Sequence, residues 1–371
     1  MIIGTAGAVA VLISVLAMGV GFARTVAGAG RADRVIIVSV GAVGEGLSSI
    51  PRDAVTRIVT APGIRHDTSG DAVADAELLV QFQAPRKGNN QPVSVALRGI
   101  GKSFGQLRPE VQIIEGRMFR PGLHEIIVGR TAAAQYGRLD VGSHVPFPGG
   151  DWTVVGVFKS AGASSLDSGA MADAETLMSA YHHNWFNSVT ALLDSPGSFG
   201  QLKAALTADV ALHVEVQRES DYFDSQSRGL NTVLKFIGYF VGGIMAAGAV
   251  FSSLNTMYGA VSSRSIEIAT LRAVGFGASA VVISVLAEAL MLAILGAAIG
   301  SLLAWLLFDG HVASMAAGGG GTQIAFALAV TPGLVVLGIV WAFVVGSIGG
   351  LFPALRAARM PVVKALTAVA R

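Results

Sequence analysis

Long uncharged apolar runs alternate with segments of ordinary polarity along the chain. The first run covers residues 2–22, and two others cover 236–261 and 278–308, the last interrupted only by Glu288. As an α-helix the first run would be about 31 Å long, which matches the hydrocarbon core of a bilayer. We therefore predict a transmembrane helix for each of these runs.

A fourth apolar run covers residues 324–355 and contains a helix-start signal. Thr331 suits the N-cap position, and Pro332 suits the first turn, where its missing N–H needs no partner. We predict the fourth transmembrane helix over 332–351, with a short strand-like approach over 322–330.

Residues 34–228 have a different composition, with frequent charges and short apolar or alternating runs. These runs predict strands at 34–40, 77–83, 93–97, 125–128, 144–147, 152–158 and 189–193. Helices are predicted at 51–60, 131–136, 172–181 and 198–207. The glycine-containing segment 148–151 predicts a hairpin between two of the strands. The mixture is typical of a folded α+β domain with its own core.

The predicted fold class is an integral membrane α-helical protein with four transmembrane helices and an inserted extracytoplasmic α+β domain. The first helix occupies residues 1–23, and the inserted domain with its stalk occupies 24–232. We expect 221–235 to continue the second span outward as that stalk. Residues 233–371 hold the other three helices, a cytoplasmic loop at 262–277 and a cytoplasmic tail at 353–371.

The orientation follows from basic residues in the short loops, which favour the cytoplasmic side. The 262–277 loop carries Arg264 and Arg272 with one acid, Glu267, whereas the 309–331 loop has no Lys or Arg. The tail has four basic residues and no acid: Arg356, Arg359, Lys364 and Arg371. The first span by itself favours the opposite insertion, because three arginines follow it: Arg24, Arg31 and Arg34. We follow the later spans, which place the α+β domain outside.

Composition removes several other classes of protein. Lys+Arg 26 against Asp+Glu 24 leaves a net charge of +2, too small a bias for binding nucleic acid. The absence of cysteine excludes disulfide scaffolds, cysteine nucleophiles and thiolate metal sites. The expected surroundings are a lipid bilayer, with no nucleic acid.

A secretory signal peptide is the alternative for the first run, because Ala27, Gly28 and Ala29 resemble a cleavage site. The run lacks a charged n-region and exceeds the usual length of about 7–15 residues for an h-region. We expect a retained anchor.

The cytoplasmic segment 263–275 is short, amphipathic and ends at Gly275. Ile268, Leu271 and Val274 recur at helical spacing, and the polar side is formed by Arg264, Glu267 and Arg272. Such a helix suits docking into a cleft on a partner protein. Its alternative is a solvated interfacial helix held by lipid headgroups.

Several motifs occur along the chain. The pattern Arg-x-x-Glu-Ile-x-x-Leu-Arg-Ala-x-Gly covers 264–275, which we name the coupling segment, and Pro-Ala-x-Arg-Ala-Ala-x-x-Pro covers 353–361 in the tail. The outer part contains Glu-Gly-Arg-Met-Phe at 115–119, Glu-Ile-Ile-Val-Gly at 125–129 and Trp-Thr-Val-Val-Gly at 152–156. The first two patterns resemble the permease domain of the FtsX/MacB family of ABC transporters, and the other three resemble the MacB-type periplasmic core domain. The resemblance departs at the beginning, where the family usually has a cytoplasmic amphipathic segment before the first span.

The resemblance implies a non-catalytic subunit that binds a separate ABC ATPase, with ATP and magnesium held by that partner and no cofactor on this chain. It also implies a permease dimer, a bacterial cytoplasmic (inner) membrane location, and an outer partner such as a periplasmic adaptor with an outer-membrane channel. Carried over to this sequence, the ATPase-coupling residues are Arg264, Glu267, Ile268, Leu271, Arg272 and Gly275. The tail residues near the same face are Pro353, Arg356, Arg359 and Pro361.

The implied function is mechanotransmission, in which ATP hydrolysis in the partner moves the outer domain and drives export or extraction of a substrate. Two alternatives stay open. One is an FtsX-like signalling subunit that activates an extracytoplasmic cell-wall hydrolase, and the other is a lipoprotein-releasing permease.

Three further groups of residues are candidate sites. Residues 96–103 resemble a P-loop whose first glycine is replaced by Ala96, but we expect a decoy because no apolar helix is predicted after it. His182 and His183 with Asp173 and Glu175 are expected to be solvated surface residues. Glu288, as an ionisable residue in an apolar run, marks either a transport role or a structural pair with Arg272 or a neighbouring helix.

Gly-x-x-x-Gly pairs at 238/242, 296/300 and 346/350 would allow close helix packing.

Overall fold

The computed structural model describes residues 1–27, 30–160, 165–317 and 322–359. The chain divides into two compact units. The helical unit consists of Met1–Gly21, Leu230–His311 and Ala327–Arg371, and the outer domain consists of Phe22–Gly229 and Val312–Phe326.

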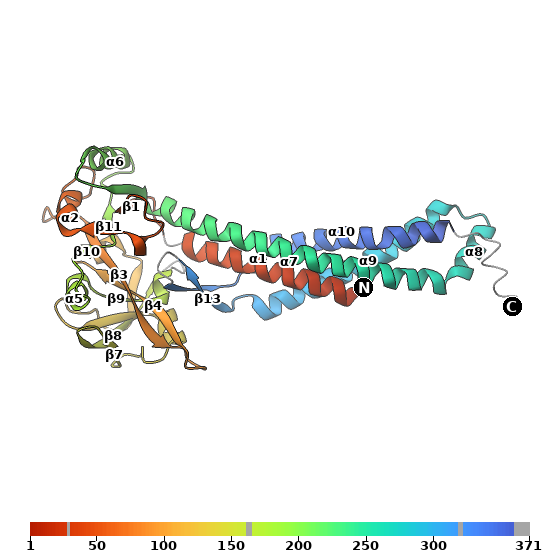
Figure 1. Ribbon diagram of the computed structural model, residues 1–371, viewed down its shortest axis with the longest axis horizontal. Coiled ribbons are helices and arrows are strands. Elements are labelled where there is room, and N and C mark those ends of the chain that lie inside the picture. The colour runs from red at the N-terminus through yellow and green to blue at the C-terminus, as the bar shows by residue number, and fades with distance from the viewer. Residues whose placement is uncertain (28–29, 161–164, 318–321, 360–371) are drawn as a thin grey trace. The chain divides into compact units, whose positions relative to one another are not determined.

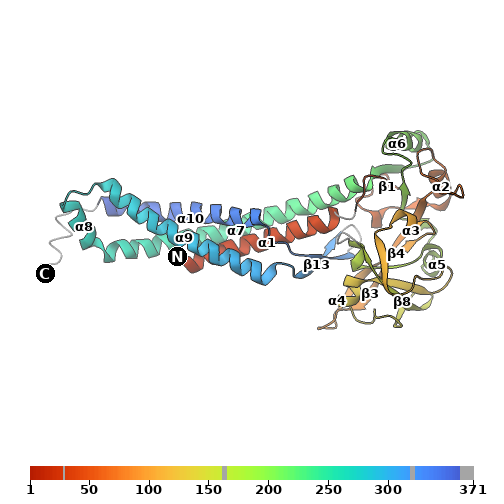
Figure 2. The same ribbon diagram turned by 180° about the vertical axis from the view of Figure 1, so that it is seen from behind.

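Four long helices form the helical unit and are each long and apolar enough to cross a membrane. They are α1 (Ile2–Ala27), α7 (Glu219–Ser263), α9 (Ala278–Phe308) and α10 (Pro332–Ala358). Figures 1 and 2 show them side by side, with the short helix α8 (Ser265–Ala273) at the end where α10 finishes. Backbone groups within a bilayer must be satisfied inside their own segment, so uncharged runs of this length form helices.

The bounds of α9 agree with the apolar run that predicted it. The N-cap of α10 is confirmed, because the Thr331 hydroxyl accepts a hydrogen bond from the Leu334 amide at 3.4 Å. α10 continues past Leu351 to Ala358 with Pro353 inside it, and α1 continues past Phe22 to Ala27. The expected stalk is part of α7, which begins at Glu219.

Glycines of the Gly-x-x-x-Gly pairs lie where helices of this unit approach one another closely. A Cβ on Gly296 would lie 1.9 Å from Thr5 Oγ1, and one on Gly300 would lie 2.4 Å from the Ala6 carbonyl oxygen of α1. A Cβ on Gly346 would lie 2.7 Å from the Ala293 Cβ of α9. α1 therefore packs directly against α9.

A ten-stranded sheet runs through the outer domain in the order β12-β1-β11-β3-β4-β9-β6-β8-β5, with β7 paired to β8. The pairs β4–β9 and β6–β8 are parallel, and the others are antiparallel. The strands are β1 (Arg34–Ser39), β3 (Ala74–Pro85), β4 (Pro92–Ile100), β5 (Val111–Gly116), β6 (Glu125–Gly129), β7 (His144–Phe147), β8 (Gly150–Ser160), β9 (Ala170–Asp173), β11 (Ser188–Leu192) and β12 (Val214–Arg218).

Two small ribbons and several short helices complete the outer domain. The ribbons pair β2 (Ile50–Pro51) with β10 (Trp185–Phe186) and β13 (Val312–Ala317) with β14 (Thr322–Ala327). The helices are α2 (Arg52–Val59), α3 (Phe104–Leu107), α4 (Arg130–Gln135), α5 (Ala174–Ala180), α6 (Ser198–Ala208), η1 (Glu45–Leu47) and η2 (Ser165–Ser168). One apolar core gathers around the fully buried Trp152, and a second lies between α2, α6 and the β1–β11 part of the sheet.

The helix predicted over 172–181 needs correction at its start. Ala172 and Asp173 belong to β9, which is buried between β4 and β6, and the helix α5 begins only at Ala174. The Asp173 carboxylate accepts a hydrogen bond from the Thr176 amide at 2.9 Å and so starts the helix. The strands β2, β5, β9, β10, β12 and β13 were not predicted. β5 is the last strand of the sheet and is mostly exposed, so it lacks the buried alternation that marks a strand.

Candidate functional site

The helix α8 has a well-defined glycine end. Gly275 has a φ of +110°, a conformation that L side chains rarely adopt. The Gly275 amide donates to the Arg272 carbonyl at 3.2 Å, and the Phe276 amide donates to the Leu271 carbonyl at 3.1 Å. These two bonds form a Schellman motif, which satisfies the last carbonyls of the helix. Gly275 therefore ends the helix through its backbone conformation, at the residue where the sequence predicted the end of the segment.

Two arginines tie α8 to the neighbouring helices. Arg264, between α7 and α8, forms an ion pair with Glu288 of α9 at 3.3 Å. Arg272 Nη1 donates to the Ala358 carbonyl at 2.7 Å, where a cation at the end of α10 is favourable. Glu288 thus has the structural pairing that the sequence left open, but its partner is Arg264 and not Arg272.

The predicted apolar side of α8 is divided between two environments. Ile268 packs against the helical core around Val285, and Ala269 is buried. Leu271 and Val274 are exposed instead, Val274 by 76%. Glu267 is also exposed, and within the described ranges no ion pair involves it. The helix therefore presents apolar and acidic side chains that nothing in the described part of the chain covers.

Three of the four predicted tail residues lie in the C-terminal part of α10 or at its C-cap. The Arg356 guanidinium lies 5.4 Å from the ring centroid of Tyr258 on α7, a cation–π distance. Pro353 is buried inside α10, and Arg359 caps the helix through its amide. Pro361, with the rest of the tail from 360 onward, lies outside the described residues.

A buried network of arginine and glutamate side chains lies in the outer domain, far in sequence from the coupling segment. Arg34, the first residue of β1, donates from Nε to Glu219 Oε2 at 2.6 Å and from Nη1 to Glu110 Oε1 at 2.6 Å. Arg108 lies 2.9 Å from the other oxygen of Glu219. The side chains of Arg34 and Glu219 are each only 1% exposed.

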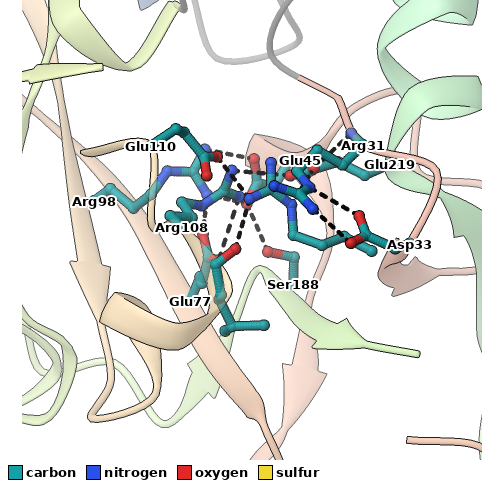
Figure 3. A network of polar contacts seen from close by, with 11 residues as sticks. Arg31, Asp33, Glu45, Glu77, Arg98, Arg108, Glu110, Ser188 and Glu219 are labelled. Atoms are coloured by element: carbon teal, nitrogen blue, oxygen red, sulfur yellow. Dashed lines mark hydrogen bonds and ion pairs between the residues drawn. The ribbon is translucent and has the colours of Figure 1, made fainter. Parts of the chain in front are cut away.

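The network continues into the middle of the sheet, as Figure 3 shows. Arg98 on β4 contacts Glu77 on β3 and donates to both oxygens of Glu45, at 2.5 and 2.7 Å. The Ser188 hydroxyl donates to Glu45 at 2.6 Å. Glu77 also lies 3.7 Å from Arg108, which joins this half to the half around Glu219. The network therefore links β1, β3, β4, η1 and the first turn of α7.

The charges of this network depend on one another. Burial is the largest single influence on Glu45 and would raise its pKa. The charge and hydrogen bonds of Arg98, with the Ser188 hydrogen bond and the charge of Arg108, together hold that pKa below its ordinary value. Burial likewise opposes the charge on Arg98, yet Glu45 and Glu77 raise its pKa well above the ordinary value. Removing one member would leave its partners charged in a dry interior, which is costly.

Sequence reasoning did not find this network. A usable signal was present in the strands, because Glu77 and Arg98 fall at strand positions that share one face of a β3–β4 pair. Arg34 and Glu219 gave no such signal, since a charge at the start of a strand or helix is ordinarily solvated.

The P-loop-like segment binds a carboxylate of the chain itself. The Ser103 amide donates to Asp75 Oδ1 at 3.0 Å, and a Cβ on Gly101 would lie 2.5 Å from the same oxygen. Lys102 is exposed and pairs with Asp71 at 2.9 Å. The Ser103 amide, which a phosphate would need, is therefore already engaged by Asp75. A helix does follow the segment, contrary to the expectation, but α3 is only the four residues Phe104–Leu107. Desolvation raises the pKa of Asp75 to about 6, against the amide hydrogen bonds that lower it.

His182 lines a cleft of about 690 Å³ together with His124, Asp173 and Glu175. Asp173 is engaged in capping α5, and Glu175 pairs with Arg52. His183 instead stacks on Trp185, with ring centroids 4.4 Å apart. Among the described residues no group of three or more His, Asp or Glu side chains is placed to hold a metal ion.

The fold and these contacts define a multi-pass membrane protein with a large domain inserted after its first helix. The family model of the MacB-like periplasmic core domain matches residues 1–209, and that of the FtsX-like permease C-terminal region matches 239–362. The chain belongs to the FtsX/MacB-type ABC transporter permeases, which confirms the resemblance and the fold class.

Two solved structures are also similar to this chain. The extracellular domain of the noncanonic ABC-type transporter YknZ from Gram-positive bacteria is 12% identical, with a TM-score of 0.37, and the match covers 50% of this chain and 99% of that one. The periplasmic region of MacB from Actinobacillus actinomycetemcomitans is 13% identical, with a TM-score of 0.39, and the match covers 52% and 91%. No curated protein sequence matches. The family assignment rests on the two family models.

Permeases of this family are generally non-catalytic membrane subunits, and they work with an ABC ATPase partner.

Proposed function

We propose that this chain is the permease subunit that couples ATP hydrolysis by a separate ABC ATPase to movement of its outer domain, and so drives export or extraction of a substrate. ATP and magnesium are held by the partner, and this chain binds no cofactor. The membrane is the bacterial cytoplasmic membrane, and two permease copies form a dimer.

The observation that carries the proposal is the geometry of α8. Its exposed Leu271, Val274 and Glu267 form a small apolar surface with an acidic group, which suits a cleft on another protein. Arg272 and Arg264 join this helix to the end of α10 and to α9, so a force on α8 acts directly on membrane helices. A helix held only by lipid headgroups would not need these attachments.

The test is co-expression with the ABC ATPase from the same gene cluster, followed by purification and measurement of ATP hydrolysis. We expect the two chains to purify together and Leu271→Ser or Glu267→Lys to lower ATPase binding about tenfold or more, as for a central interface residue. Leu123→Ser and Glu215→Lys are matched controls, because these exposed residues lie in the outer domain. If no ATPase associates with the unaltered chain, the proposal is wrong.

The outer partner that purifies with this complex distinguishes the forms of the function. A periplasmic adaptor with an outer-membrane channel supports export, and a lipoprotein carrier supports extraction. A cell-wall hydrolase that is activated without transport would replace the proposal with the signalling alternative.

A further inference from the structure

The segment that follows α1 and the segment that precedes α7 lie against each other in the outer domain. A Cβ on Gly30 would lie 2.7 Å from Ser220 Cα, so only glycine fits there without a shift. The Ser220 amide donates to the Arg31 carbonyl at 3.3 Å, and the Arg31 amide donates to Glu219 Oε2 at 3.1 Å. We name residues 30–34 and 218–220 the joint.

The joint continues into the sheet. Arg218 Nη1 donates to the Ala32 carbonyl at 2.7 Å, and the strands β1 and β12 pair from Val35 and Arg218 onward. The segment after α1 and the segment before α7 are thus neighbouring strands as well as contacting loops. Displacement of one segment relative to the other would break backbone hydrogen bonds together with side-chain contacts.

Glu219 connects the joint to the interior of the domain. It lies in the first turn of α7, where a negative charge is favoured by the helix dipole. Its carboxylate contacts Arg34 and Arg108, and Arg34 Nη1 also donates to the Leu107 carbonyl at 2.6 Å. A surface ion pair contributes little stability because water screens it. In the pair of Arg34 and Glu219 both side chains are 1% exposed, so loss of either partner would strongly destabilise the protein.

We propose that the joint is the anchor through which α7 displaces the outer domain as one body, and that Arg34 and Glu219 are its positioning residues. The proposal rests on the function proposed above. A helix that ended in a solvated linker would move without carrying the domain. Here the first turn of α7 is fixed to β1 and to the 107–110 segment, so movement of that turn is passed to the sheet.

Spin labels measure this directly, because the chain has no cysteine. The labelled chain is diluted with an excess of unlabelled chain, so that each proposed permease dimer holds a single labelled pair. One label is placed at Asp151→Cys, exposed at the start of β8, and the other at Gly229→Cys on α7, where a Cβ meets nothing within 4 Å. In the complete complex with its ATPase, we expect one narrow distance distribution both without nucleotide and with ATP and vanadate.

Glu219→Ala should broaden that distribution and lower permease-dependent ATPase stimulation at least about threefold, while the ATPase subunit still binds. Glu219→Gln keeps an oxygen acceptor for the Arg31 amide and should give an intermediate effect. Asp221→Ala is the matched control, because this exposed acid lies in the same first turn. If Glu219→Ala does not fold, Glu219→Gln and Arg34→Lys supply the comparison.

If the folded Glu219 and Arg34 variants kept the unaltered label-distance distribution and ATPase stimulation, the proposal that the joint anchors the outer domain would be wrong. A broad distribution in the unaltered complex would also overturn it, because the domain would then move independently of α7. If the ATPase does not bind the unaltered chain, the proposed function fails first. Because binding is measured separately from the label distance, the two failures are distinguishable.

Discussion

Arg34 and Glu219 are 185 residues apart in the sequence and form an ion pair of 2.6 Å in the interior of the outer domain. The pair joins the start of β1 to the first turn of α7. It therefore joins the segment that follows α1 to the start of α7. The outer domain also continues toward α9 and α10 through Val312–Phe326.

Arg34→Met should lower the free energy of unfolding of the outer domain by about 3–5 kcal/mol, because it leaves Glu219 and Glu110 without the buried cation between them. Urea unfolding of the full chain, followed by tryptophan fluorescence, measures this change. Replacing Trp185, Trp305 and Trp341 by Phe in every variant leaves the buried Trp152 as the reporter. Arg31→Met is the control, since the Arg31 side chain is 48% exposed and its pair with Asp33 should contribute less than about 1 kcal/mol. Equal losses for both variants would contradict the prediction.

Asp75→Asn should stabilise the outer domain at neutral pH. The pKa of Asp75 in the folded chain is about 6, above the value of about 3.9 expected when unfolded, so the folded state binds the proton more tightly. The stability contributed by that proton is complete below about pH 4 and is lost as the pH rises through about 6. The amide carries no charge, so the variant should gain about 2–3 kcal/mol over the unaltered chain at neutral pH.

Unfolding measured between about pH 4 and pH 7 tests this, because the gain should grow with pH and then level off. Asp71→Asn is the control, since Asp71 is 60% exposed and pairs with Lys102 at the surface. A gain that did not depend on pH would mean that packing, and not ionisation, explains the effect.

Gly300→Ala should disturb the packing of α1 on α9 and cost about 1–3 kcal/mol, because the added Cβ would lie 2.4 Å from a backbone oxygen of Ala6. Gly259→Ala on α7 is the control, where a Cβ meets nothing within 4 Å and alanine favours the helix. The midpoint temperature of thermal unfolding, measured on the detergent-solubilised protein, should therefore fall for Gly300→Ala only. A similar shift for both would argue against close α1–α9 packing.

Gly275→Val should weaken association with the ATPase subunit. Valine disfavours a φ of +110° by at least about 1 kcal/mol, so the Schellman end of α8 would be lost and Leu271 would move. Gly277→Ala is the control, because Gly277 has an ordinary φ of −67°. Co-purification with the ATPase and stimulation of its activity compare the two variants. Unchanged binding and stimulation for Gly275→Val would show that association does not need the glycine end of α8.

The transmembrane helices could be predicted because their signal is local. An uncharged run long enough to span a bilayer has few alternatives to a helix, and Thr331 with Pro332 marks one start without any tertiary information. The sequence signal for the hairpin of β7 and β8 was also local, because a proline–glycine turn lies between two strands of alternating polarity. The start of α5 was placed two residues early because Ala172 favours a helix but is held in the sheet.

The ion network could not be predicted in the same way. Arg34, Glu77 and Glu219 look like ordinary solvated charges in sequence, and their burial depends on which strands become neighbours. The partner of Glu288 was also undetermined, since Arg264 and Arg272 lie in the same short loop and only the packing of α8 selects Arg264.

Hydrophobicity and helix signals along the sequence were sufficient for the membrane class, the four long helices and the inserted α+β domain, because bilayer burial imposes its requirement on each segment separately. The tertiary structure decided which charges are buried, which glycines allow helix contact, and which side of α8 stays exposed. These features depend on distances between segments far apart in the chain. The pairing of Arg34 with Glu219 arises only when β1, β12 and the start of α7 come together.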